Sequence, residues 1–167
     1  MKKGLRMKFE FSSVSISVMT LVISILVSLV STTSMAESPI KVVGATTVDL
    51  VAAKKLFDAG SVFIDVRDTR AWSYGHIEGA VHLDFNSDEF VILYVSDALD
   101  RETPIVFYCD SALGATGAMA AFFASSWGYK NVYYFREGYY SWMASDHPVE
   151  FNVATMEQEL PSSLLVE

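Results

Sequence analysis

The chain has 167 residues, with 12 Lys and Arg against 20 Asp and Glu, and its formal net charge is −8 at pH 7. A negative field of this size repels nucleic acid and anionic lipid, so it excludes proteins that bind either one through a basic surface. The length suffices for one domain with its own hydrophobic core and short extensions. Cys109 is the only cysteine, which excludes an internal disulfide.

The first 36 residues have the pattern of a secretory signal peptide. Basic residues fall within the first eight positions, an apolar run covers residues 14–30, and Ser34 and Ala36 form a small-x-small site before Glu37. We expect cleavage after Ala36 and a periplasmic or secreted mature protein with no membrane contact. The alternative is an uncleaved N-terminal membrane anchor, because the run approaches the ~17–25 residues that span a bilayer. Without residues 1–36, which hold four of the basic residues and one acidic residue, the formal charge is −11.

Beyond this segment, short apolar runs alternate with amphipathic ones. KVVGA (41–45) predicts a first strand. The segment TTVDLVAAKKLFDAG (46–60) predicts a helix, with Asp49 as candidate N-cap and Gly60 just past the last turn.

Four more apolar runs predict strands, and three further segments predict helices. The strands are expected at 61–66, 80–85, 103–109 and 130–135, and the helices at 87–99, 116–128 and 136–148. Strands separated by helices indicate an α/β domain with a mostly parallel central sheet of about five strands, flanked by helices. We assign this domain to residues 41–150, followed by a polar C-terminal tail at 151–167.

Cys109 ends the predicted strand 103–109, at the sheet edge where parallel α/β proteins gather ligands. The loop DSALGAT (110–116) leads from it into a helix whose N-cap we expect at Thr116. The free N–H groups and the positive dipole end of that helix would favour the thiolate form of Cys109. The alternative is an inert, buried cysteine that only packs.

The loop is rich in small residues, which let a backbone curl and present several amides to one anionic centre. These residues are Ser111, Ala112, Gly114 and Ala115. The sequence has no CxxC motif, no HExxH motif and no cluster of histidines with carboxylates, so we expect no metal site.

Three motifs, in order over 41–150, resemble the single-domain rhodaneses, which have the thiosulfate sulfurtransferase-like fold. FIDVRDTRAWSYGHIEGAVHLDF (63–85) is similar to the family's DVR…GHIxGA signature, and IVFYC (105–109) with its small-residue loop is similar to the active-site strand and loop. WGYKNVYYFREGYYSWMASDHPVE (127–150) is similar to the closing signature. The resemblance implies the three-layer rhodanese-like fold.

The resemblance also implies sulfur chemistry at Cys109 without a metal or organic cofactor. In the family, the thiolate attacks a small sulfane-sulfur donor, holds the sulfur as a persulfide, and passes it to a thiol or another thiophilic acceptor, or to a protein partner. Backbone amides of the loop stabilise the negative charge. The corresponding residues here are Asp110, Ser111, Ala112, Leu113, Gly114, Ala115 and Thr116.

The loop departs from the family pattern in its charge. Ala112 stands near the usual Gly, Gly114 stands near the usual Arg, and the loop carries no Lys or Arg. We therefore do not expect a phosphatase-like activity, because it needs an Arg to clamp a tetrahedral anion. Asp110 adds a negative charge beside the sulfur, which favours a neutral or thiol-bound donor over thiosulfate.

Three charged residues at the same sheet edge are further candidates. Asp65 and Arg67 end a predicted strand, and we expect an internal ion pair that fixes the following loop, with a role in shaping the pocket as the alternative. Arg136 follows the last strand and is a candidate for the cation that the loop lacks. Two other functions stay open: a non-catalytic binding or regulatory module with this fold, and a thiol redox sensor.

Overall fold

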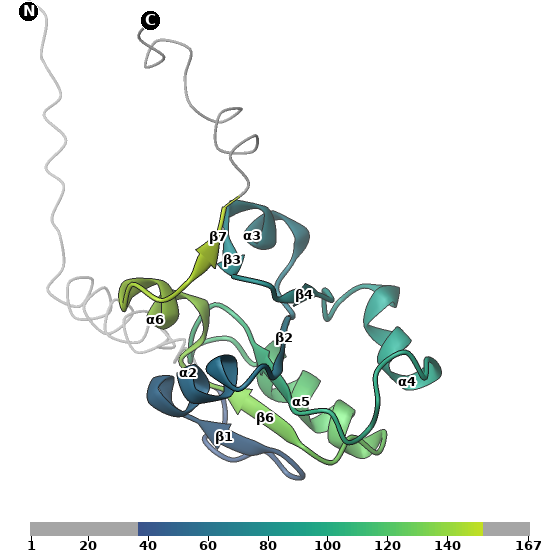
Figure 1. Ribbon diagram of the computed structural model, residues 1–167. Helices are drawn as coiled ribbons and strands as arrows, with labels where there is room; N and C mark the ends of the chain where they lie inside the picture. Colours follow the sequence, from purple (N-terminus) through teal and green to yellow (C-terminus); the bar gives the residue numbers. More distant parts are fainter. Residues whose placement is uncertain (1–36, 152–167) are drawn as a thin grey trace, which may run out of the picture. The chain divides into compact units, whose positions relative to one another are not determined.

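The computed structural model describes residues 37–151, so the predicted signal peptide and the predicted tail beyond residue 151 lie outside the described residues. Five strands form one parallel sheet in the order β1-β6-β5-β2-β4 (Figure 1). Helices pack on both faces of this sheet, which confirms the predicted three-layer α/β class. Within residues 37–151, no helix is both long and apolar enough to cross a membrane.

The elements follow the predicted alternation of strand and helix along the chain, apart from α3, β3 and β7, which were not predicted. In chain order they are β1 (Thr46–Val48), α2 (Leu50–Asp58), β2 (Val62–Asp65), α3 (Thr69–Tyr74), β3 (His76–Ile77), β4 (Val81–His82), the 3-10 helix η1 (Asp88–Val91), α4 (Ile92–Val95), β5 (Ile105–Tyr108), α5 (Thr116–Ser126), β6 (Val132–Phe135), α6 (Gly138–Ala144) and β7 (Val149–Glu150).

The predicted first strand at 41–45 is wrong. Ala45 N donates to Val42 O at 3.2 Å in a turn, and Val43 is 79% exposed. The first strand is β1, directly after this turn, and it pairs with β6. The predicted N-cap is confirmed, because Asp49 accepts from Ala52 N at 2.8 Å and Leu50 is the first residue of α2. Residues 46–48, at the start of the segment assigned to this helix, form β1 instead.

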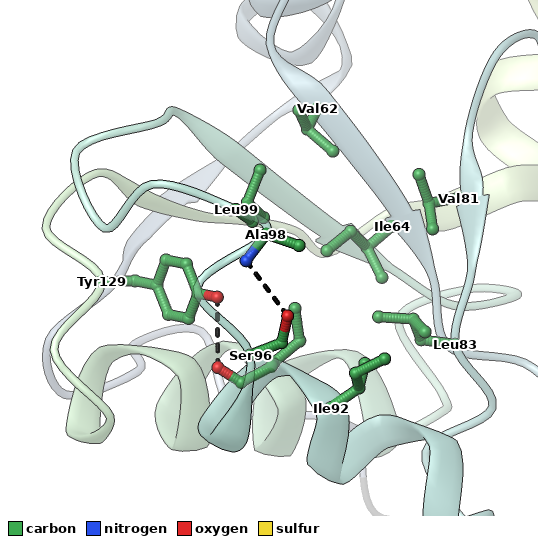
Figure 2. Close-up of a pocket in the computed structure, with 10 residues that line it drawn as sticks. Val62, Ile64, Val81, Leu83, Ile92, Ser96, Ala98, Leu99 and Tyr129 are labelled. Carbon is green, nitrogen blue, oxygen red and sulfur yellow. Dashed lines mark hydrogen bonds between the residues drawn. The ribbon is translucent and has the colours of Figure 1, made fainter.

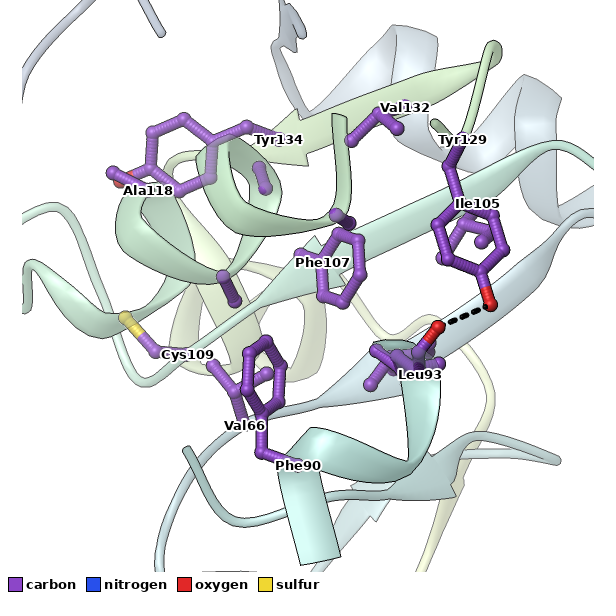
Figure 3. Close-up of a cluster of buried hydrophobic side chains, with 14 residues drawn as sticks. Val66, Phe90, Leu93, Ile105, Phe107, Cys109, Ala118, Tyr129, Val132 and Tyr134 are labelled. Carbon is purple, nitrogen blue, oxygen red and sulfur yellow. Dashed lines mark hydrogen bonds between the residues drawn. The ribbon is translucent and has the colours of Figure 1, made fainter. Parts of the chain in front are cut away.

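The central strand β5 separates two cores because its side chains alternate between the faces of the sheet. Ile105, Phe107 and Cys109 belong to the cluster beneath α5 and α4, whereas Val106 and Tyr108 belong to the cluster beneath α2 and α6. Figure 3 shows the first cluster, with Cys109 at one end and Tyr129 at the other. The cysteine thus ends a fully buried strand on the face that α5 covers.

Helix α5 contacts the sheet through its small residues rather than its large ones. Its buried residues are Gly117, Ala118, Ala120, Ala121 and Ala124. Met119, Phe122 and Phe123, which recur at helical spacing, are 40%, 44% and 40% exposed. Because only glycine and alanine face the sheet, the helix backbone lies close to the strands that carry the site.

A two-stranded antiparallel sheet, formed by β3 and β7, was not expected from the sequence. Ile77 pairs with Val149, and His76 pairs with Glu150, whose carboxylate Oε2 lies 3.2 Å from the imidazole Nε2. This pairing joins the chain after α6 to the segment between α3 and β4.

Candidate active site

Cys109 is 3% exposed and directly follows β5. Its Sγ lies 3.5 Å from the carbonyl oxygen of Ser111 and 3.4 Å from that of Gly114. A thiol has one hydrogen to donate, so the two carbonyls are alternative acceptors for the neutral form. Among residues 37–151, no backbone amide donates to this sulfur, so the expected role of the loop amides stays a prediction.

The start of α6 holds the first peptides of the loop from outside. Tyr139 N donates to Cys109 O at 2.8 Å, and Tyr140 N donates to Asp110 O at 3.1 Å. In a planar trans peptide, the N–H points opposite to the preceding carbonyl. The amides of Asp110 and Ser111 therefore point away from α6.

A second contact holds the middle of the loop. Ala112 O accepts from Ser38 N at 2.8 Å and from Ser38 Oγ at 2.9 Å. The N–H of Leu113 consequently faces away from Ser38, and it donates to Ser111 Oγ at 3.3 Å. Each of these three loop carbonyls is thus fixed from outside by a donor that belongs to another segment.

Two glycines permit the close contacts around the sulfur. A Cβ built on Gly114 would lie 2.9 Å from Cys109 Sγ, so a larger side chain here would displace the thiol. Gly138 has φ of +68°, and a Cβ there would collide with the carbonyl of Cys109. Only glycine combines this left-handed backbone with so close an approach.

The end of the loop differs from the prediction. The N-cap of α5 is Ala115, which offers no side-chain cap, and Thr116 is the first helical residue. Thr116 cannot cap the helix because the cap position is the residue before the first helical one, which here lies in the αR region. Leu113 is 54% exposed and Ala115 is also exposed, so the solvent-facing surface of the loop carries apolar side chains.

The expected ion pair between Asp65 and Arg67 is present and buried. Arg67 Nε lies 2.9 Å from Asp65 Oδ1, and Arg67 Nη2 lies 2.6 Å from Asp65 Oδ2, while the two residues are 5% and 0% exposed. Burial alone would lower the pKa of Arg67, but the hydrogen bonds and the charge of Asp65 outweigh it and the pKa is raised. The same guanidinium donates to Gly75 O at 2.6 Å and stacks 4.3 Å from the ring centroid of Tyr139.

Arg67 also connects this pair to the loop. Its Nη1 lies 3.3 Å from Asp110 Oδ1, and the Asp110 side chain is 45% exposed. The guanidinium therefore offsets part of the negative charge that stands beside Cys109. Arg67 itself is too deeply buried to meet a donor from solvent.

Arg136 is engaged by residues that precede the predicted start of the domain. Its Nη2 lies 2.7 Å from Glu37 Oε2, and its Nε donates to Ser38 O at 3.2 Å. Ser38 is 3% exposed, and its Oγ accepts from Tyr134 OH at 2.7 Å. The packing of the described structure thus begins before Lys41, with Ser38 held between Arg136 and the loop.

Sequence reasoning missed Ser38, Tyr134 and Tyr139 as parts of the site. Their contacts are made across long sequence separations by single hydroxyl or backbone groups, which leave no periodic pattern in the chain. Burial raises the pKa of Tyr134 and that of Tyr139, so both phenols are neutral hydrogen-bonding groups near neutral pH.

A cavity of about 270 Å³ lies apart from Cys109, between α4 and the strands β2 and β4 (Figure 2). Its only polar side chains are Ser96 and Tyr129. Ser96 Oγ accepts from Ala98 N at 3.0 Å, and Tyr129 OH donates to Leu93 O at 3.1 Å. Because both hydroxyls already have partners and the other lining side chains are apolar, the cavity offers no group for sulfur chemistry.

A cysteine that ends the central strand of a five-stranded parallel sheet, followed by a tight loop into a helix, defines a class of α/β domain. The family model described as "Rhodanese-like domain" matches residues 49–145. The chain therefore belongs to the family of rhodanese-like domains.

Curated relatives are sulfurtransferases by name. The thiosulfate sulfurtransferase GlpE of Haemophilus influenzae is 29% identical over 98 residues, which cover 59% of this chain and 88% of the relative. The protein of the same name from Pseudomonas entomophila is 36% identical over 87 residues, which cover 52% of this chain and 73% of the relative. Sulfur transfer is thus the activity that this family-level similarity supports.

Solved structures agree with the fold. The rhodanese-like domain of the Anabaena sp. Alr3790 protein has a TM-score of 0.55 at 24% identity, over 69% of this chain and 83% of that one. The polysulfide-sulfur transferase homodimer of Wolinella succinogenes has a TM-score of 0.53 at 24% identity, over 65% of this chain and 80% of that one. At these identities the likeness concerns the fold alone.

Proposed function

We propose that this protein is an exported sulfurtransferase or sulfur carrier in which Cys109 forms a persulfide. The Sγ thiolate attacks the sulfane sulfur of a donor, an S–S bond forms, and one of the donor's own bonds to that sulfur breaks with its electron pair leaving on the donor fragment. A thiophilic acceptor such as a thiolate then attacks the outer sulfur of the persulfide. This second step releases the acceptor's persulfide and regenerates the Cys109 thiolate.

The single observation that carries the proposal is the position of Cys109. The only cysteine of the chain directly follows β5, at the carboxyl edge of the sheet, and is followed by residues 110–115 and the first turn of α5. A persulfide carries negative charge, and the hydrogen bonds from α6 to the carbonyls of Cys109 and Asp110 direct the N–H groups of Asp110 and Ser111 away from α6, so we infer that these two amides can turn toward it. No metal or organic cofactor takes part in the proposed steps.

The charge around the loop bears on the donor. Asp110 stands beside the sulfur with only partial compensation from Arg67, and the loop itself carries no cation. We therefore expect a neutral organic polysulfide, or a sulfur bound to a thiol, to react faster than thiosulfate when nothing else offsets this charge.

The test is the mass of the processed chain after incubation with a neutral sulfane donor, for which dimethyl trisulfide serves. The Cys109 thiolate attacks the central sulfur of this donor and displaces methanethiolate, which then attacks the terminal sulfur of the resulting trisulfide and leaves the Cys109 persulfide and dimethyl disulfide. We expect a gain of one sulfur atom that a reducing thiol removes. The Cys109→Ser variant should show no gain, whereas Ser73→Ala, which changes a hydroxyl on exposed α3, should react like the wild type. An unmodified wild-type chain would refute the proposed function.

A second candidate is a non-catalytic binding module with this fold. Two observations favour it: the Cys109 thiol is bonded to carbonyl oxygens, and α5 exposes Met119, Phe122 and Phe123. It predicts a thiol that stays unmodified by sulfane donors. A redox sensor, the third alternative, predicts instead that peroxide joins two chains through Cys109, which a non-reducing gel would detect.

A further inference from the structure

Residues 37 and 38, here termed the strap, are held against the active-site loop. Ser38 is 3% exposed, and both its N and its Oγ donate to Ala112 O. Tyr134 OH donates to Ser38 Oγ, and Arg136 Nε donates to Ser38 O. A segment bonded through its backbone and its side chain has a fixed position, unlike the ends of most domains.

The strap coincides with the predicted cleavage site. Cleavage after Ala36 would make Glu37 the first residue, with a free α-amino group attached to a fixed backbone. One residue spans about 3.3–3.6 Å, and Ser38 N is 2.8 Å from Ala112 O. The new amino group would therefore lie within about 6–7 Å of the carbonyl of Ala112.

The two arginines near the loop are already engaged with carboxylates. Arg67 is paired with Asp65 and contacts Asp110, while Arg136 is paired with Glu37. The loop residues 110–115 contain no Lys or Arg. Besides the exposed Lys41, which lines a pocket with Ala115 at the end of the loop, a positive charge for an anionic ligand would have to come from a group outside these side chains.

We propose that the α-ammonium group created at Glu37 by cleavage serves as the cation of the Cys109 loop and makes the processed chain reactive toward anionic sulfur donors such as thiosulfate. This inference rests on the proposed function. It makes the uncleaved chain a poor acceptor of sulfur from anions, because an amide replaces the ammonium group at this position. Cleavage after Ala36 would thus control the reaction with anionic sulfur donors through the single positive charge of the Glu37 α-ammonium group.

Three groups with a charge or a titratable proton belong to the strap or contact it, namely Glu37, Arg136 and Tyr134, and two more, Cys109 and Asp110, stand at the start of the loop that the strap holds. The Glu37 carboxylate and Arg136 form an ion pair, so together they leave the ammonium charge largely uncompensated. Tyr134 is a neutral donor to Ser38 Oγ, and burial raises the pKa of its phenol. Asp110 contributes the opposing negative charge.

The reaction with thiosulfate balances without another reactant. The Cys109 thiolate attacks the outer, sulfane sulfur of the thiosulfate dianion, and the new S–S bond forms as the bond between the two thiosulfate sulfurs breaks. Sulfite leaves with the electron pair of the broken bond. The ammonium group would stabilise the approaching dianion and the departing sulfite by charge alone.

The experiment compares two exported chains, each produced from its full-length precursor and checked at its N-terminus by mass. The first is the wild type, and the second carries a Gly-Gly-Gly insertion between Ala36 and Glu37, which moves the ammonium up to about 10 Å along the chain. Both keep every residue of the strap. The rate of Cys109 persulfide formation is measured with thiosulfate and, separately, with neutral dimethyl trisulfide.

We expect the insertion to slow the reaction with thiosulfate about tenfold at low ionic strength, and added salt to narrow the difference. The reaction with dimethyl trisulfide should be equal in the two chains. An α-amino group ordinarily loses its proton with a pKa of about 7.7–8.0, so the wild type alone should lose reactivity toward thiosulfate, relative to the neutral donor, as the pH rises through about 8.

Equal thiosulfate rates in the two chains, or the same pH profile for both, would overturn this inference while leaving the proposed function intact. A wild-type N-terminus at a residue other than Glu37 would overturn it as well. Failure of the wild type to react with either donor would instead refute the sulfurtransferase function itself.

Discussion

Replacing Arg67 by methionine should be among the most destabilising single changes in this domain. Asp65 is fully buried and its carboxylate is bonded to the guanidinium through both oxygens. The substitution leaves that charge buried without its partner, which costs about 3–5 kcal/mol in the free energy of unfolding. Gly75 O and Asp110 also lose a donor.

The matched control is Lys54→Met, because Lys54 forms an ion pair with Asp58 on the surface of α2. Exposed pairs of this kind contribute less than about 1 kcal/mol. Urea unfolding of the processed chains, followed by circular dichroism, gives both free energies directly. If Arg67→Met costs no more than Lys54→Met, the conclusion that the buried pair organises the edge of the site is incorrect.

Two further predictions concern the packing of the site and its response to pH. Gly138→Ala should destabilise by about 2 kcal/mol more than Gly60→Ala, because both sites have positive φ but only the first would push a Cβ into the Cys109 carbonyl; equal melting temperatures for the two variants would contradict this. Burial raises the folded-state pKa of Tyr108 and Tyr134 above the ordinary value of about 10, so their contribution to stability is complete below about pH 10 and is lost as the pH rises through the folded-state values. Urea midpoints should therefore fall as the pH rises above about 10, less steeply in Tyr134→Phe, and a flat profile would argue against buried neutral phenols.

The order of the fold could be predicted because buried parallel strands are continuous apolar runs. Residues 61–66 and 103–109 show this signal clearly, and they contain β2 and β5. A continuous apolar run cannot indicate a strand of only two residues. β3 and β7 have two residues each, and they pair residues that lie far apart in the sequence, such as His76 and Glu150.

The face of α5 also could not be read from periodicity. Met119, Phe122 and Phe123 share one side of the helix, which usually indicates burial, yet the opposite side packs on the sheet. Glycine and alanine fill that side because the helix lies close to the strands, and small residues carry little hydropathy signal. Cys109 was identified because its place at a strand end is visible in the sequence.

The ion pair of Asp65 and Arg67 was also foreseeable, since the two residues are close neighbours at a strand end. The partners of the loop were not foreseeable. Ser38 reaches Ala112 across most of the domain sequence, through a single carbonyl that no side-chain pattern encodes. Such backbone contacts become evident only when the fold brings the segments together.

The glycine and alanine residues on the buried side of α5 limit how this protein can change its conformation around a ligand. A Cβ on Gly117 would lie 3.0 Å from Tyr134 Cε2 and 3.4 Å from Cys109 N, so the helix has no room to approach further and already touches what lies beneath it. The 110–115 loop is consequently held at both ends, by β5 where it begins and by α5 where it ends. Space for a ligand next to Cys109 Sγ must therefore come from rotation of individual peptide planes in the loop, while α5 and the sheet keep their positions.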